Sequence, residues 1–459
     1  MRRLRAAVRS NASESAKCAK NAKGAKKRIK KRISWRSWLL GVLGAYESSK
    51  AQSPEESRMI TLPIYLDYNA TTPVDPRVVE LMTTYLTRVF GNAASKTHAY
   101  GRAAEEAVLR ARNQVAVLLN VEQDDRLGAR EIVFTSGATE ANNLAIKGVA
   151  DQYRDRGRHI ITQVTEHSSV LGTCKRLAER GYEITYLSVD AGGRVSPQQI
   201  ADAIRPDTIL VSIMYANNET GVIQPMDAIG KICKERGVLF HTDATQALGK
   251  IPIDVHAEGI DLLACSAHKL YGPKGVGALY VRKRDPRVRL TALIDGGGHE
   301  RGFRSGTLNV PGIAALGLAC EIAGKEMDAQ TARLSALRDR IVNSAKKLGG
   351  VRVNGHPSPI LPHVANLSFE GVDGMSLLNA LDGLAVSSGS ACTSASMEAS
   401  HVLRGMGIGE ALAHASIRFS LGRMTTDEEI EFAVKKVGEV IPRLRTEKET
   451  DCEACETGG

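Results

Sequence analysis

Short apolar runs rich in β-branched residues alternate with longer amphipathic stretches from residue 59 onward. Runs of the first kind are typical of buried strands, and the stretches between them have the periodicity of helices. This alternation predicts βαβ units, and so an α/β fold with a mostly parallel central sheet and flanking helices. The predicted strands cover residues 132–135, 159–162, 184–187, 208–213, 239–242, 262–264 and 277–281.

A smaller unit is predicted towards the C-terminus. A long helical pattern occupies residues 313–348, and a new strand pattern at 364–369 begins a smaller α+β unit. Since a single core stops growing near roughly 250–300 residues, we expect at least two domains. The predicted parts are an N-terminal segment that packs with the small domain, a large domain, the small domain and a polar, disordered tail, at residues 59–78, 79–324, 325–445 and 446–459.

Residues 1–58 carry the excess positive charge of the chain. They hold 16 Lys or Arg residues and four Glu, so residues 59–459 have a net charge near −2 although the whole chain has +10. The main part therefore has no basic surplus for binding a nucleic-acid backbone. The apolar patch at 34–45 is too short to span a bilayer, which needs about 20 residues. Direct contact with nucleic acid or a membrane is not expected.

Three interpretations of this basic extension remain open. It is a disordered segment or upstream sequence added by a wrong start codon, since Met59 stands just before the first strand-like run. Alternatively it is an organelle transit peptide, which its Arg-rich and acid-poor composition fits, or a membrane or nucleic-acid contact. The first interpretation is favoured and predicts a cytoplasmic protein, whereas a transit peptide predicts the mitochondrial matrix.

The cysteines do not form a disulfide framework. Eight of them stand at positions 18, 174, 233, 265, 320, 392, 452 and 455, without the regular spacing of secreted disulfide proteins. This favours a reducing compartment. Cys452 and Cys455 form a lone CxxC, which is either part of a solvated tail or a metal or redox site, and the solvated tail is favoured. No metal ligands are predicted.

Candidate chemistry centres on a lysine at the end of a predicted strand. Lys269 lies in a glycine-rich turn beside Ser266 and His268, where a lysine can form a Schiff base with a carbonyl cofactor. Asp243 ends another predicted strand, and a carboxylate there can pair with the pyridinium nitrogen of pyridoxal phosphate.

Two further features fit the same cofactor. The glycine turn at 136–143 opens a helix after a strand, so it is either a phosphate site or a plain N-cap. His167 follows another strand and either stacks on a ring or has a structural role.

Together these segments resemble the cysteine desulfurases of the NifS/IscS type, in the aminotransferase class V group of fold-type I pyridoxal-phosphate enzymes. The resemblance covers about residues 60–445. The motifs that carry it are YLDYNATTP, SGATEANN, EHSSV, NNETG, HTDATQ, SAHKLYGPKG, GGGHERGFRSGT, SSGSACTSAS and SIRFSLGR. Two small departures, at residues 91–93 and 397–401, are expected to leave the chemistry unchanged.

The resemblance implies a role for each candidate residue. Lys269 forms the Schiff base, Asp243 pairs with the pyridine nitrogen and His167 stacks on the ring. Arg418 pairs with the substrate carboxylate, for which a planar bidentate donor is suited, and Asn218 also contacts the substrate. The residues that hold the phosphate or the ring substituents are Ala138, Thr139, Asn218, Gln246, Ser266, His268 and Thr307, the last from the other subunit of a homodimer.

The reaction depends on Cys392. It lies in the small polar run 387–396, which predicts an exposed loop, whereas a buried structural cysteine would have apolar neighbours. In the family this cysteine, as thiolate, takes the sulfur of L-cysteine as a persulfide and leaves L-alanine. The implied acceptors of that sulfur are an iron–sulfur scaffold or a tRNA thiolation protein, and Cys392 could contact a transferred iron–sulfur cluster.

Two other classes of function fit parts of this sequence. A selenocysteine lyase or another class V aminotransferase would share Lys269 and Asp243, but an aminotransferase needs no loop cysteine. A non-enzymatic membrane or nucleic-acid binding protein would rest on residues 1–58 alone.

Overall fold

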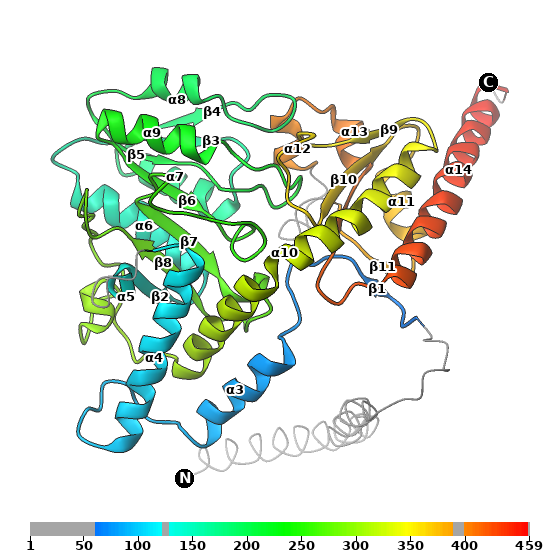
Figure 1. Ribbon diagram of the computed structural model, residues 1–459. Coiled ribbons are helices and arrows are strands. Elements are labelled where there is room, and N and C mark those ends of the chain that lie inside the picture. Colours follow the sequence, from blue (N-terminus) through cyan, green and yellow to red (C-terminus); the bar gives the residue numbers. More distant parts are fainter. Residues whose placement is uncertain (1–59, 122–127, 389–398, 458–459) are drawn as a thin grey trace, which may run out of the picture. The chain divides into compact units, whose positions relative to one another are not determined.

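The computed structural model describes residues 60–121, 128–388 and 399–457, which belong to one compact unit (Figure 1). Its main feature is a seven-stranded sheet with the strand order β2-β8-β7-β6-β5-β3-β4. The strands are β2 (Ile132–Thr135), β3 (His159–Gln163), β4 (Glu183–Leu187), β5 (Thr208–Ser212), β6 (Leu239–Asp243), β7 (Leu262–Ser266) and β8 (Gly277–Val281). All seven predicted strands are present, with ends that differ by at most two residues. Only β8 runs antiparallel to its neighbours β2 and β7, so the prediction of a mostly parallel sheet is confirmed.

Helices cover both faces of this sheet. Successive strand residues point to opposite faces, so Ile132 and Phe134 pack in one core while Val133 packs in another. The first core includes α4 (Ala99–Leu118), α8 (Pro197–Ala203), α9 (Met226–Arg236) and the first half of α10 (Val310–Lys346), and the second includes α6 (Ala138–Gln152) and α7 (Ser168–Ala178). The remaining short elements are α3 (Pro76–Thr87), α5 (Gly128–Glu131), η2 (Ala267–Lys269) and η3 (His299–Gly302).

A second, smaller sheet forms the C-terminal part. Antiparallel strands in the order β12-β10-β9 make this sheet, and β1 (Ile64–Tyr65) pairs in parallel with β11 (Leu384–Ala385). The elements of this C-terminal part are β9 (Val351–Val353), β10 (Val364–Phe369), α11 (Gly374–Ala380), α12 (His401–Gly405), α13 (Glu410–His414), β12 (Ser416–Ser420) and α14 (Asp427–Thr457). Ile64 and Leu66 are buried in this part's core, so the segment before α3 packs there.

Helix α10 connects the two parts without a break. Its residues from Val310 to Ala323 pack in the large core, and those from Leu334 to Ala345 pack in the small one. The predicted boundary at residue 325 falls between these stretches. Helix α14 differs from expectation, because it continues through residues 446–457, which we had expected to be disordered. The exposed Arg443–Glu447 pair, one helical turn apart, supports the helix at the start of that stretch.

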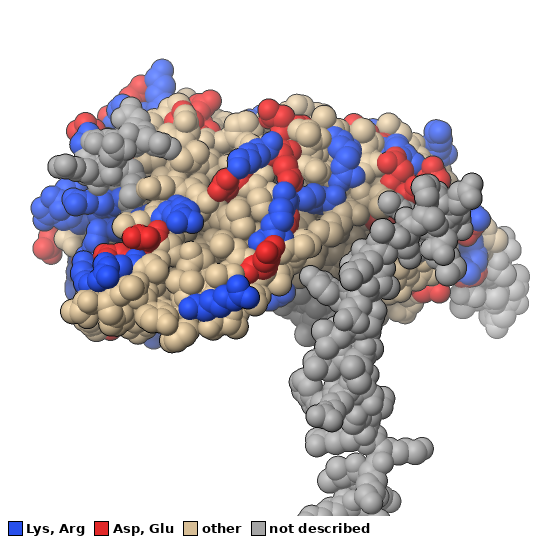
Figure 2. Space-filling view, turned by 60° about the horizontal axis from the view of Figure 1, so that its bottom comes forward, with Lys and Arg blue, Asp and Glu red and all other residues tan. Residues whose placement is uncertain are grey.

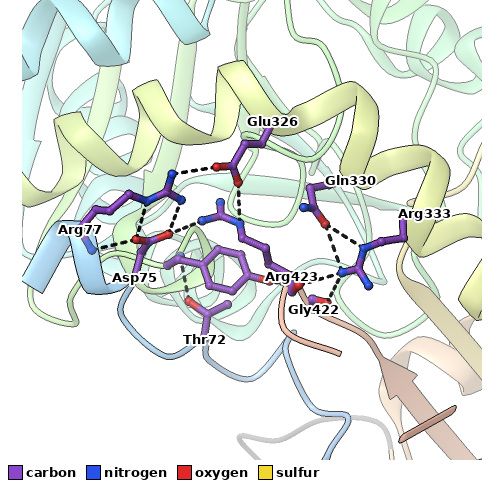
Figure 3. Close-up of polar contacts among 9 residues, drawn as sticks. Thr72, Asp75, Arg77, Glu326, Gln330, Arg333, Gly422 and Arg423 are labelled. Carbon is purple, nitrogen blue, oxygen red and sulfur yellow. Dashed lines mark hydrogen bonds and ion pairs between the residues drawn. The ribbon is translucent and has the colours of Figure 1, made fainter. Parts of the chain in front are cut away.

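A polar cluster also joins the parts (Figure 3). Asp75, the N-cap of α3, accepts hydrogen bonds from Arg77 and Arg423 at 2.7 and 2.6 Å. Glu326 of α10 pairs with the same two arginines at 2.9 and 3.2 Å. The guanidinium of Arg423 lies 4.2 Å from the centre of the Tyr271 ring. These five residues, called here the Asp75 cluster, connect α3, α10 and the segment after β12.

Charged side chains are otherwise interspersed. On the face shown in Figure 2, basic and acidic residues alternate rather than gather by sign. Exposed ion pairs such as Arg176–Glu179 and Arg340–Asp427 also bring opposite charges together at the surface. Within residues 60–121, 128–388 and 399–457, no helix has both the length and the apolar character needed to cross a membrane.

The ion pair between Arg112 and Glu300 lies in the interior and should matter for stability. Arg112 and Glu300, whose side chains are 6% and 1% exposed, form a bidentate pair at 2.7 and 2.6 Å. Glu300 also accepts from the Phe134 amide on β2 at 2.8 Å. Removing one partner leaves a buried charge without compensation.

We therefore expect Glu300→Ala to lower the free energy of unfolding by about 3–5 kcal/mol. Urea unfolding of the variant and wild type measures this difference. The control is Glu179→Ala, which removes an exposed carboxylate paired with Arg176 and should cost at most about 1 kcal/mol. Equal losses in the two variants would contradict the special weight given to the interior pair.

Candidate active site

A cavity of about 680 Å³ opens where the strands of the large sheet end. The carboxyl ends of parallel strands meet at one edge of a sheet, and ligands of α/β proteins bind there. The cavity is lined by residues that follow β2, β3, β5, β6 and β7, and by one residue of β12. It brings together ten of the candidate residues, namely Ala138, Thr139, His167, Asn218, Asp243, Gln246, Ser266, His268, Lys269 and Arg418.

Two candidates are placed differently. Thr307 lies between η3 and α10, is exposed, and does not line this cavity. Cys392 lies outside the described residues, as do residues 1–58 of the basic extension. The side chains of Cys452 and Cys455 are also outside the description.

One end of the cavity can hold an anion. Helix α6 begins at Ala138 directly after β2, and Gly137 provides no side-chain cap, so the first amide groups of the helix face the turn. A Cβ at Gly277 would lie 2.7 Å from the Gly137 Cα, so the close approach of these chains requires glycine. Burial, followed by the nearby lysines, lowers the pKa of His268 to about 4, and the ring is therefore neutral. Amides at a helix start with Ser266 nearby form a suitable phosphate cradle.

A carboxylate and an imidazole are oriented by one hydrogen-bond chain. Asp243 ends β6 and is 6% exposed, and it accepts from Asn142 Nδ2 at 2.7 Å and from the Thr245 amide at 3.0 Å. Asn142 Nδ2 also donates to Ser169 Oγ at 2.9 Å, and Ser169 Oγ bonds His167 Nδ1 at 2.8 Å. The carboxylate and the ring are thus fixed relative to each other.

Lys269 is held by the N-terminal segment. Its Nζ donates to the backbone carbonyls of Asn69 and Ala70, the latter at 2.6 Å. The Asn69 carbonyl also accepts from Gln246 Nε2 at 3.1 Å. The Asn69 side chain bonds His363 at 2.8 Å. Asn69 therefore positions two candidate residues through its main chain.

Arg418 projects from the smaller sheet into the cavity. It is 1% exposed, and its two terminal nitrogens donate to Asp67 Oδ1 at 2.6 Å and to the Asn218 carbonyl at 3.0 Å. Its Nε is buried and has no hydrogen-bond partner among the described residues. A fixed guanidinium with a remaining donor can bind a small carboxylate.

Further cavity residues escaped the sequence analysis. Glu219 is fully buried, burial raises the pKa of its carboxyl group, and it accepts from Ser400 Oγ at 2.5 Å. His401 lines the cavity and bonds the Glu166 carbonyl at 3.0 Å. The sequence offered one signal for two of the missed residues, because Asn69 stands in the motif YLDYNATTP and Glu219 in the motif NNETG.

Comparisons with known proteins agree on one relationship. The family model for aminotransferase class-V matches residues 64–432. The cysteine desulfurase IscS of Anaeromyxobacter sp. (strain K) is 55% identical over 385 residues, covering 84% of this chain and 94% of the relative. A solved NifS-like protein has 39% identity and a TM-score of 0.76, covering 83% of this chain and 100% of that one. The structure of SspA in complex with cysteine also has 39% identity, with a TM-score of 0.69 and coverage of 79% and 99%.

Proposed function

Because this chain belongs to the class-V aminotransferases and, among them, to the cysteine desulfurases, we propose that its cavity takes sulfur from L-cysteine and transfers it to Cys392. The products are L-alanine and a persulfide on Cys392. The supporting observation is that Lys269, Asp243, His167 and Arg418, from four separate strands or turns, line one cavity. The desulfurase relatives favour this function over selenocysteine lyase or aminotransferase activity.

Enzymes of this family generally use pyridoxal phosphate, and the residues here fit that cofactor. The start of α6 with Thr139, Ser266 and His268 would hold its phosphate. Asp243 would pair with the ring nitrogen, and Lys269 would bind the aldehyde carbon. When bound, the cofactor withdraws electrons from the bonds of the substrate's α carbon.

Arg418 selects and orients the substrate. Its guanidinium binds the carboxylate of L-cysteine, while Asp67 and the Asn218 carbonyl keep the guanidinium plane in place. Because the arginine is buried, this ion pair is stronger than one in water. The amino group of the substrate is then directed towards Lys269 in the same cavity.

His167 holds and moves protons. The Ser169 amide donates to Nδ1 at 3.2 Å, so the neutral ring carries its proton on Nε2. The bond from Nδ1 to Ser169 Oγ, which Asn142 also contacts, keeps the ring orientation constant. A proton at Nε2 can therefore be exchanged with the substrate without rotation of the ring.

Cys392 completes the reaction. Its thiolate attacks the sulfur of the substrate, so an S–S bond forms while the C–S bond breaks. The electron pair of the broken bond stays on carbon, which is protonated to give L-alanine. No external oxidant or reductant is needed, because the two electrons that the sulfur atoms lose in forming the S–S bond stay on the carbon that becomes the methyl group of L-alanine. The persulfide then passes to an acceptor such as an iron–sulfur scaffold or a tRNA thiolation protein, in the cytoplasm or the mitochondrial matrix.

The direct test incubates the purified protein with pyridoxal phosphate and L-cysteine. We expect one alanine for each sulfur delivered, and an added sulfur atom on the Cys392 peptide in mass spectra. Alanine without any protein-bound sulfur would favour direct release of sulfur, as in a lyase.

Thr307 gives a test of the proposed homodimer. It is exposed and lies outside its own chain's cavity, which fits a contact with the phosphate bound by the other subunit. Since a hydrogen bond to a charged group contributes about 1.5–3 kcal/mol, Thr307→Ala should weaken cofactor binding roughly 10- to 100-fold.

Mixed dimers decide whether Thr307 acts across the interface. Consider a dimer of one Lys269→Ala chain and one Thr307→Ala chain. If Thr307 acts on the site of the other subunit, the site in the Thr307→Ala chain keeps its own Lys269 and receives an intact Thr307 from its partner. An equal mixture after subunit exchange should therefore regain roughly a quarter of the wild-type sites. A contact within one chain would leave no complete site, so absence of recovery, or an active monomer in sedimentation, would contradict the proposal.

A further inference from the structure

A second lysine lies behind the active site. Lys250 is half-buried, its amine is surrounded by protein atoms, and Nζ donates to Gln246 Oε1 at 3.0 Å. The turn that precedes it is tightly packed, because Gly249 has a φ of +69° and a Cβ there would lie 2.3 Å from Leu270. Lys250 does not line the active-site cavity, whereas Gln246 does.

Lys250 instead lines a separate cavity of about 40 Å³. The lining of that cavity also includes Tyr271, Glu326 and Arg423, which belong to the Asp75 cluster (Figure 3). This cluster connects the large and the small parts, so both parts enclose the lysine. Among the described residues, Lys250 forms no ion pair, and the carboxylate of Glu326 is already paired with Arg77.

Lys250 determines how the Gln246 amide is turned. An ammonium group can only donate hydrogen bonds, and Lys250 Nζ donates to Gln246 Oε1, so the amide oxygen faces Lys250. The amide nitrogen then faces the Asn69 carbonyl at 3.1 Å, and this carbonyl also accepts from Lys269 Nζ. The two lysines are therefore the ends of one chain of hydrogen bonds.

The surroundings of Lys250 are mostly cationic or neutral. Burial, followed by Lys269 and Arg418, lowers the pKa of Lys250 to about 7. The titratable or charged groups that face it or line its cavity are Tyr68, His268, Lys269, Tyr271, Glu326, His363, Arg418 and Arg423. The amine is charged below about pH 7 and neutral above it, and it can donate to Gln246 in both states.

We propose that Lys250 is a positioning residue of this active site, which fixes the Gln246 amide and which, in its protonated form, favours the unprotonated nitrogen of Lys269. A nearby cation disfavours a second positive charge, and a lysine beside another cationic group is activated as a nucleophile. This inference rests on the proposed function, since it assigns Lys269 to the cofactor.

Three substitutions separate charge from hydrogen bonding. Lys250→Met removes both, Lys250→Gln keeps an N–H donor without charge, and Lys250→Arg keeps both. The measurement is the pH titration of the visible absorption band of bound pyridoxal phosphate. We expect Met and Gln to raise its midpoint by roughly half a pH unit or more, and Arg, which stays charged at every accessible pH, to hold it at or below the wild-type midpoint. The Met variant should also release the cofactor several-fold faster than the Gln variant, because Gln246 can turn.

Lys325→Met is the charge-matched control. Lys325 is an exposed residue of α10, 71% exposed at the side chain, and its removal should leave the midpoint unchanged because solvent screens the charge. A loss of stability alone would lower the melting temperature without moving the midpoint. An unchanged midpoint in the Met and Gln variants overturns the proposal. That outcome differs from failure of the proposed function, which would appear as wild-type protein that forms no alanine from L-cysteine.

Discussion

Replacing Cys392 by serine should leave cofactor and L-cysteine binding intact and lower alanine formation roughly a thousandfold. A hydroxyl group is a far weaker nucleophile towards sulfur than a thiolate at neutral pH. The residues proposed to bind cofactor and substrate, among them Lys269, Asp243 and Arg418, line one cavity and are themselves unchanged by the substitution. Rapid-mixing absorbance should therefore show that L-cysteine still changes the cofactor spectrum, while alanine analysis shows almost no product.

The other cysteines make poor substitutes for Cys392. Cys265 is 1% exposed, and burial raises the pKa of its thiol to about 12, so it carries almost no thiolate at neutral pH. Cys455→Ser is the control and should keep wild-type activity. Near wild-type turnover by Cys392→Ser, or a persulfide found on Cys265 or Cys455, would overturn the assignment.

Lys269→Ala should abolish covalent attachment of the cofactor and lower alanine formation by roughly a thousandfold or more. Lys269 is the candidate because its Nζ lies in the same cavity as the buried carboxylate of Asp243. Borohydride reduction of the wild type followed by peptide mapping should find the cofactor on Lys269, and reduction of the variant should find none.

A comparison with Lys250 tests why the cofactor should attach to Lys269. The lowered pKa of Lys250 makes its amine reactive near neutral pH, yet Lys250 lines the small separate cavity and donates to the Gln246 side chain. We therefore expect no cofactor on the Lys250 peptide. Cofactor bound there would show that reactivity, rather than position in the cavity, chooses the lysine, and would contradict both lysine assignments.

The pattern of apolar and polar residues was sufficient to predict where the strands lie, but not in which direction each strand runs. An apolar run such as 277–281 has the same character in either direction, so nothing local reveals that β8 is antiparallel to β2 and β7. The tail beyond residue 446 was misjudged for a related reason. Its polarity matches disorder, but a polar helix continued from a packed one also lacks apolar residues.

Some residues of the candidate site could be predicted from the sequence, and others could not. Those with a distinctive side chain after a strand, such as Lys269 and Asp243, could be chosen from sequence and resemblance. Asn69 could not, because it holds Lys269 through a backbone carbonyl that every residue possesses. Glu219 was missed because burial, which the sequence does not display, is what makes its carboxyl group unusual.

By itself, the sequence determined the alternation of strands and helices, the residue types available for cofactor chemistry and the position of Cys392, because these depend on local periodicity and side-chain identity. The tertiary structure alone decided which groups meet. Lys269 and Asn69 are 200 positions apart, and Arg418 reaches the cavity from a different sheet. It also decided which groups are dehydrated, because removal from water is a property of the whole fold, and this gives Lys250 and Glu219 their shifted pKa values.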